Sequence, residues 1–387
     1  MSNSTDEMLI SPKAKRGRHN KSENEDRLSN LPDCILLHLL SFLKVKYAVQ
    51  TCVLSTRWKD LWKRLHNLIL LSSDFSSLRS FTKFMSRLLT LRDGSIALQN
   101  LDFEREGFVE PHLLKRIMKY AVSHNIQQLR LSVRCDIKHF PHCIISSKTL
   151  TSLKLAIHPK VKSPCYKKQT LFPKSLYNLP ALTSLHLVNF AFWENHHGIA
   201  EPFSAFIKLN SLIIENCSLS EAHCTLSISS RTLCHLTVFN QYRLLHKTEL
   251  SSPSLRTFAF EGTPYQKLTG SNLSSLEQVH INVANWSLEQ EDREMLMWAN
   301  YPQPPFILLS WLLKLPNIKL LTFSACTLQA LFLFRYTLKL KAAILSDMSL
   351  ELIENKTGTD FIWISKSRIG TRSRWNSKLS ASKLYKG

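Results

Sequence analysis

The chain has 387 residues, a formal net charge of +21, 44% apolar residues and only 9 glycines. The length suggests about two or three domains, the apolar share is ordinary for folded proteins, and the few glycines disfavour a glycine-dependent nucleotide loop. The longest apolar runs, such as 306–313, fall short of the roughly 18 residues of a membrane-spanning helix. The polar N-terminus lacks the apolar core of a secretion signal, so we expect a soluble intracellular protein.

Residues 1–25 are polar and charged with few aliphatic side chains, and we expect them to be disordered. Within them, residues 12–18 (PKAKRGR) resemble a short nuclear-import signal. Basic runs of this length also occur by chance, so the sequence leaves nucleus and cytoplasm both open as locations.

The stretch 26–70 begins with a predicted helix. Leu31 and Pro32 open it, because proline suits a first helical turn. Apolar residues then recur at spacings of three and four from Ile35 to Leu43. They cover an arc of roughly 160° at ~100° per residue, whereas a helix buried on one side needs only about 100°. The extra width suggests one apolar contact inside the domain and another with a second molecule.

Two further short helices follow. Residues 47–53 form one helical run, and Ser55 is a plausible N-cap for a third helix on which Trp58, Leu61, Trp62 and Leu65 share one stripe. Three helices in about 45 residues bury too little surface to be secure alone. This unit must therefore lean on the domain that follows or on a partner.

The segments LPDCILLHLLSFL and AVQTCVLSTRWKDLW resemble the F-box of the large plant F-box/leucine-rich-repeat family. Cys34 stands where an acidic residue is usual, and Lys44 where proline is usual. The resemblance implies docking on a Skp1-like adaptor and, through it, on the cullin and RING subunits of a ubiquitin ligase. The residues implied to supply the docking face or the packing behind it are Leu31, Pro32, Ile35, Leu36, Leu40, Leu43, Leu54, Trp58 and Trp62.

One spacing recurs through the rest of the chain: apolar, two spacers, apolar, one spacer, apolar. It is the signature of leucine-rich repeats, in which the last two apolar residues lie on a short strand that faces the core. Stacked units form a curved solenoid with a parallel sheet on the concave face. The matches are 98/101/103, 126/129/131, 150/153/155, 182/185/187, 209/212/214, 233/236/238, 255/258/260, 276/279/281 and 318/321/323.

The predicted fold class is thus α/β: a three-helix F-box followed by a leucine-rich-repeat solenoid. The expected boundaries are 1–25 for the disordered N-terminus, 26–70 for the F-box, 71–340 for the repeats and 341–387 for a basic, loosely ordered tail. The spacer between the two inward residues of each strand should face outward and is a candidate target contact. These spacers are Arg130, Lys154, His186, Ile213, Thr237, Ala259, His280 and Thr322.

No catalytic or metal-binding pattern stands out. The 9 cysteines are scattered without a CxxC pair, and P-loop, GxSxG and HExxH motifs are absent. Cys217 and Cys326 follow repeat strands, where a buried thiol is a packing residue. We therefore expect no cofactor, no metal and no intrinsic enzyme activity.

Two functions remain in competition. The first is the substrate-receptor subunit of a Skp1–cullin–F-box ubiquitin ligase, with an unknown target protein on the repeat surface. The second is a binding scaffold outside any ligase, whose basic excess in 134–174 and after residue 360 attracts nucleic acid or acidic partners. The basic residues are not interleaved with an aromatic platform, which disfavours nucleic acid.

Overall fold

The computed structural model describes most of the chain between residues 28 and 365. The described residues are 28, 30–135, 140–158, 170–177, 179–221, 224–240, 247–264, 267–283, 304–312, 318–324, 327, 348–355 and 358–365. The predictions for residues 1–25 and for Cys326 lie outside this set.

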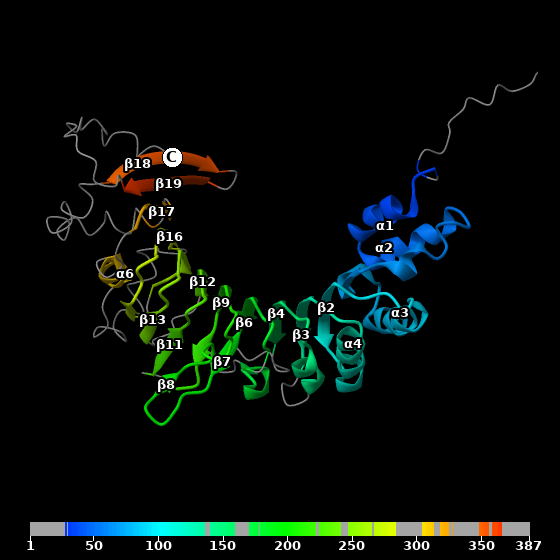
Figure 1. Ribbon diagram of the computed structural model, residues 1–387, viewed down its shortest axis with the longest axis horizontal. Coiled ribbons are helices and arrows are strands. Elements are labelled where there is room, and N and C mark those ends of the chain that lie inside the picture. Colours follow the sequence, from blue (N-terminus) through cyan, green and yellow to red (C-terminus); the bar gives the residue numbers. More distant parts are fainter. Residues whose placement is uncertain are drawn as a thin grey trace, which may run out of the picture.

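The molecule is a curved solenoid with helices at its N-terminal end and two strands at its C-terminal end (Figure 1). Its main sheet has 12 strands in the order β1-β2-β3-β4-β6-β9-β12-β14-β16-β17-β19-β18. The strands from β1 to β17 pair in parallel, as a repeat solenoid requires. They are β1 Asn67–Leu71, β2 Asn100–Phe108, β3 Gln128–Arg134, β4 Ser152–His158, β6 Ser184–Val188, β9 Ser211–Glu215, β12 His235–Asn240, β14 Thr257–Gly262, β16 Gln278–Asn282 and β17 Leu320–Ser324.

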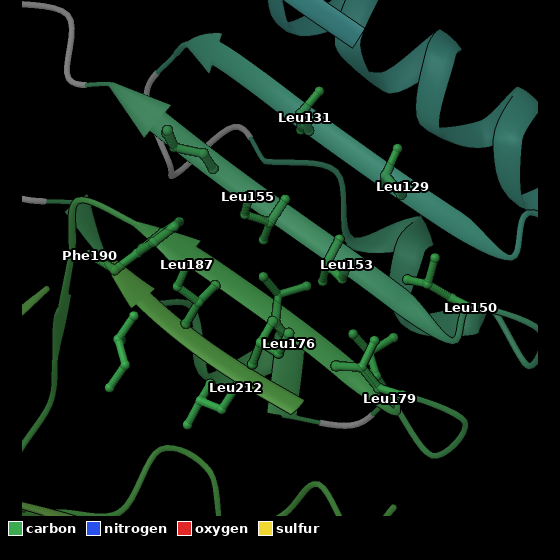
Figure 2. Packing of buried hydrophobic residues seen from close by; sticks show 14 of the residues in the cluster. Leu129, Leu131, Leu150, Leu153, Leu155, Leu176, Leu179, Leu187, Phe190 and Leu212 are labelled. Atoms are coloured by element: carbon green, nitrogen blue, oxygen red, sulfur yellow. The ribbon is translucent and has the colours of Figure 1, made fainter. Parts of the chain in front are cut away.

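The apolar residues of all nine predicted repeats point into one continuous core. All are buried except Val238 and Ile318, which are half-buried. Figure 2 shows part of the resulting ladder, in which Leu129 and Leu131 on β3 lie beside Leu153 and Leu155 on the neighbouring strand β4. The prediction of a leucine-rich-repeat solenoid with a parallel sheet is therefore confirmed.

The solenoid begins one turn earlier than predicted. Leu65, Leu68 and Leu70 repeat the same spacing and are buried, and β1 pairs in parallel with β2. The predicted F-box ends at residue 70 and so includes these three leucines. They are also the first apolar residues of the sheet, and the sequence prediction therefore misses the first solenoid turn.

The outer layer changes along the solenoid. The first turns are closed by the amphipathic helices α3 (Leu78–Leu91) and α4 (Pro111–Ser123), and the next by the 3₁₀ turns η5 (His142–Ser146) and η6 (Lys174–Tyr177). Later turns are closed by two small parallel sheets, ordered β10-β7-β5 and β15-β13-β11-β8. These strands are β5 Thr170–Leu171, β7 Phe190–Phe192, β8 Ile199–Ala200, β10 Ser218–Leu219, β11 Thr225–Ser229, β13 Lys247–Ser251 and β15 Lys267–Ser271. Helix α6 (Pro304–Leu312) lies beside β15.

The N-terminal unit has two α-helices, α1 (Asp33–Ser41) and α2 (Val45–Gln50), the latter extended by the 3₁₀ turn η1 (Thr51–Val53). The predicted third α-helix is wrong. Residues 56–60 form successive turns, and the 3₁₀ helix η2 (Leu61–Arg64) follows.

The composition of that segment explains the difference. Ser55, Thr56, Trp58 and Asp60 are weak helix formers, so short i to i+3 bonds such as Trp58 N–H to Ser55 O replace α-helical ones. The predicted apolar stripe is nevertheless buried: Trp58, Leu61, Trp62 and Leu65 all lie in the core.

The sequence predicts a loosely ordered tail after residue 341, yet two antiparallel strands lie within it. They are β18 (Met348–Asn355) and β19 (Gly358–Ser365), and β19 pairs with β17 to extend the main sheet. Both segments are rich in the aliphatic and aromatic residues that favour strands, for example FIWI in β19. The pattern carries no LxxLxL spacing because this hairpin is antiparallel and is not a repeat.

Gly262 is the residue at which the solenoid backbone least tolerates a side chain. Its φ is +125°, and a Cβ there would lie 1.8 Å from the carbonyl oxygen of Asn240. We expect Gly262→Ala to cost at least about 3 kcal/mol of unfolding free energy, measured by urea titration. Gly94→Ala is the control, since its nearest atom would be 4.0 Å away. Equal unfolding midpoints for the two variants would contradict the expectation.

Cys217 is a packing residue, as predicted. Its thiol is buried and donates weakly to the carbonyl oxygen of Leu187, 3.6 Å away, and burial raises its pKa to about 12. A neutral, enclosed thiol reacts poorly with alkylating agents. We expect iodoacetamide at pH 8 to modify the exposed Cys34 and to spare Cys217 until urea is added, as peptide mass spectrometry would show. Early labelling of Cys217 would argue against this packing.

Candidate binding surfaces

Helix α1 has two apolar faces, and only one is used by the fold. Leu36 and Leu40 are buried in the core, whereas Ile35, Leu39 and Phe42 are exposed on a stripe with spacings of four and three. Eight of the twelve large apolar residues that are exposed in the described part of the chain lie between residues 28 and 54. We call these eight the apolar face: Leu28, Ile35, Leu39, Phe42, Leu43, Tyr47, Val53 and Leu54.

The nine predicted docking residues divide between this face and the packing behind it. Those exposed are Pro32, Ile35, Leu43 and Leu54, and Leu31 is half-buried. Those buried are Leu36, Leu40, Trp58 and Trp62. Their part in docking remains a prediction, but the buried four can act only by supporting the exposed ones.

The sequence reasoning missed several of the most exposed apolar residues. Phe42 is 70% exposed and Val53 83% exposed, and Leu39 lies between Ile35 and Phe42 on the outer stripe of α1. A helical wheel gives the arc but not which half of it faces the core. The packing of α1 against η2 decides which half of the arc is buried.

Polar contacts hold the parts of this unit together. Asp33 at the start of α1 accepts hydrogen bonds from Arg57 at 2.8 Å and from Arg64 at 3.3 Å. The hydrogen bond from Arg57 is the main reason that the pKa of Asp33 lies below its usual value, so its carboxylate stays ionised. The predicted third helix is thus replaced by turns that two arginines tie to α1.

A second set of contacts joins this unit to the solenoid. Lys44, which stands where the resemblance leads one to expect proline, forms a 2.7 Å ion pair with Asp74. Lys46 donates to the carbonyl oxygen of Asp74 and lies 5.1 Å from the centre of the Phe75 ring. The helical unit therefore leans on the first solenoid turn, as its small size requires.

On the concave face, the predicted outward residues form a single row. Each is the direct register partner of the next, from Arg130 on β3 to Thr322 on β17. Arg130 and His280 are exposed, and Lys154, His186, Ile213, Thr237, Ala259 and Thr322 are half-buried. Alternation along the strands thus predicted their positions correctly, and their role in target binding remains a prediction.

The charged members of this row have partners in two places. Arg130 lies 3.6 Å from Asp102, the next residue of the row on β2. His186 lies 3.2 Å from Glu215 on β9, and burial, then the charge of Lys154, lowers the pKa of His186. The first half of the concave face is therefore charged in both signs, while the row from Ile213 to Ala259 is uncharged.

Metal clusters and membrane-spanning helices are both absent from the part of the chain that the structure describes. No group of three or more His, Cys, Asp and Glu side chains there could hold a metal ion. No helix among these residues is long and apolar enough to cross a membrane.

Comparison with known families matches residues 28–70 to an F-box domain. This range ends in the first strand of the sheet, where the helical unit and the solenoid share residues. An F-box with an apolar outer face, followed by a solenoid of leucine-rich repeats, defines the class of the protein.

Curated relatives from Arabidopsis thaliana include F-box proteins, some of which also have LRR-repeat in their names. An F-box/LRR-repeat protein is 28% identical over 319 residues, 79% of this chain and 63% of the relative. A putative FBD-associated F-box protein is 26% identical over 66% of this chain and 54% of its own length. An F-box/FBD/LRR-repeat protein is 31% identical over 49% of this chain and 39% of its own.

The chain therefore spans between about two fifths and two thirds of the length of these relatives. The domain match, the repeat solenoid and the relatives together support its assignment to the plant F-box/leucine-rich-repeat family.

Proposed function

We propose that the chain is the target-recognition subunit of a Skp1–cullin–F-box ubiquitin ligase. The apolar face carries the proposal, because it leaves Ile35, Leu39 and Phe42 in water on the outer side of a helix whose inner side is already buried. Soluble monomers seldom expose apolar residues in such a cluster unless it binds something. The matched F-box domain supports a Skp1-type adaptor as the class of partner.

In this proposal the chain positions a target and leaves the chemistry to others. The adaptor links the apolar face to the cullin and RING subunits, which bring the activated ubiquitin. The solenoid presents the target at a fixed distance and orientation, so that transfer gains from proximity rather than from a catalytic group of this chain. The contacts of Lys44 and Lys46 with Asp74 would keep the F-box and the solenoid in one orientation. The complex would act in the nucleus, the cytoplasm or both.

The test is direct binding of the full chain to a purified Skp1-type adaptor. Calorimetry measures the affinity, and size-exclusion chromatography measures the size of the complex. We expect a one-to-one complex with a dissociation constant below about 1 μM, equivalent to roughly −8 kcal/mol. The heat capacity change should be negative, because apolar surface is buried. A folded chain that fails to bind any Skp1-type adaptor at micromolar concentrations would overturn the proposal.

A further inference from the structure

Three basic side chains lie side by side on the concave face. Arg130 on β3, Lys154 on β4 and His186 on β6 are direct register partners. Neighbouring strands are about 4.8 Å apart, and like charges placed opposite one another cost stability. Burial is the main cause that lowers the pKa of His186, and the charges of Lys154 and Arg130 lower it further. The positive charge of the row therefore comes from Arg130 and Lys154, which face each other on neighbouring strands.

Among the described residues, Arg130 and His186, at the two ends of this basic row, each lie beside a carboxylate, whereas Lys154 in the middle does not. Arg130 has Asp102 at 3.6 Å, and His186 has Glu215 at 3.2 Å. Lys154, half-buried between them, forms no ion pair with any described residue. Its ammonium group is therefore the member of the row that is available to a carboxylate from outside.

Two aliphatic side chains lie next to the His186 end of the basic row. Ile213 on β9 is the register partner of His186 and is half-buried, and Val188 on β6 pairs with Glu215. The two aliphatic side chains and the hydrogen-bonded His186–Glu215 pair thus occupy one small area of adjoining strands. A ligand that reaches Lys154 meets apolar surface about two strands, or roughly 10 Å, further along.

Acidic residues in the neighbouring row restrict the charge of the occupant. Glu104, Glu215 and Glu261 all belong to the row that runs beside Lys154, two positions along each strand. They would repel a chain of phosphates but leave room for one carboxylate at Lys154. The net charge of +21 adds a general attraction for acidic proteins. These features favour a discrete carboxylate next to an apolar group over a nucleic acid.

We propose that the concave face from β3 to β9 binds an acidic segment of a partner protein, with a carboxylate on Lys154 and an apolar side chain against Ile213. The proposal rests on the proposed function only in regarding this partner as the ligase target. The binding itself requires no adaptor, so the two proposals can fail separately.

Selection of random peptides displayed on phage against the purified full chain tests this proposal. We expect the wild-type chain to enrich peptides in which Asp or Glu accompanies a large apolar residue. Lys154→Glu should lose that enrichment and bind the selected peptides about tenfold more weakly. Ile213→Ser should weaken binding without changing the preference for acid. Lys119→Glu on α4 is the control for charge, because this exposed lysine lies on the outer layer.

Each outcome decides the matter. Loss of acidic enrichment in Lys154→Glu but not in Lys119→Glu supports the site, whether or not the chain binds an adaptor. No acidic enrichment with the wild-type chain, or the same enrichment with Lys154→Glu, overturns it. A parallel selection with random single-stranded RNA distinguishes the other class of partner. Enrichment of RNA that depends on Lys154, without acidic peptides, would assign the surface to nucleic acid and refute the proposal.

Discussion

Phe42→Asp is expected to weaken binding to a Skp1-type adaptor by at least about 100-fold, or roughly 3 kcal/mol. Phe42 ends the outer stripe of α1, is 70% exposed and stacks edge-on against His38, with ring centres 4.8 Å apart. A carboxylate at this place would have to be desolvated in an apolar interface without a partner. The fold should tolerate the change, because the side chain supports nothing in the free chain. Calorimetry with the purified adaptor measures the loss.

Ile207→Asp is the matched control. Ile207 is 68% exposed, so the substitution removes a comparable apolar side chain and adds the same charge, but it lies in the turn before β9. Both variants should keep the urea midpoint of the wild type, and only Phe42→Asp should lose the adaptor. If Phe42→Asp binds as tightly as Ile207→Asp, the outer stripe of α1 is not the docking surface.

Leu36→Asp would not give the same information. Leu36 is fully buried behind the stripe, and a carboxylate there would unfold the helical unit, so any loss of binding would follow from lost structure. The difference between these two residues, six positions apart on one short helix, is what the structure adds to the sequence. Spacing alone places both residues in the apolar arc. It does not show that Leu36 is buried and that Phe42 is exposed.

The solenoid could be predicted because its information is local. Each turn repeats the spacing seen in Leu129 and Leu131, and a two-residue period determines which side chains face the core and which face outward. The same rule found the concave row from Arg130 to Thr322 before any contact was known. Periodicity of this kind survives low sequence similarity, because any aliphatic side chain of about the right size maintains it.

Other parts could not be predicted, because their signals depend on distant residues. The outer strands β5, β8 and β10 are only two residues long, too short for any periodic pattern. The pairing of His186 with Glu215 joins residues on different turns, and only the register of the strands reveals it. The predicted third helix differs for another reason. Its apolar stripe is buried as expected, but tertiary packing buries it on turns and the short 3₁₀ helix η2 rather than on an α-helix.

Arg92→Met should destabilise the chain by about 3–5 kcal/mol. Arg92 is 4% exposed at the end of α3, where its guanidinium donates to the carbonyl oxygens of Leu65, Ile96 and Ala97 and to the hydroxyl of Tyr120, at 2.8–3.1 Å. Methionine would fill much of the space but would remove every donor, so buried oxygens would lose their partners. Urea titration measures the change in unfolding free energy.

The position of Arg92 makes this loss specific. Leu65 lies two residues before the sheet begins at Asn67, and Ile96, Ala97 and Tyr120 belong to the first solenoid turns. The Arg92 side chain therefore joins the F-box to the solenoid. Arg116→Ala is the control, since Arg116 donates at an exposed site to Ser86 and Thr90 and should cost less than about 0.5 kcal/mol. Hydrogen exchange in Arg92→Met should rise first in β1 and α1. Uniform exchange along the solenoid, or a cost no greater than that of Arg116→Ala, would show that the joint does not depend on this guanidinium.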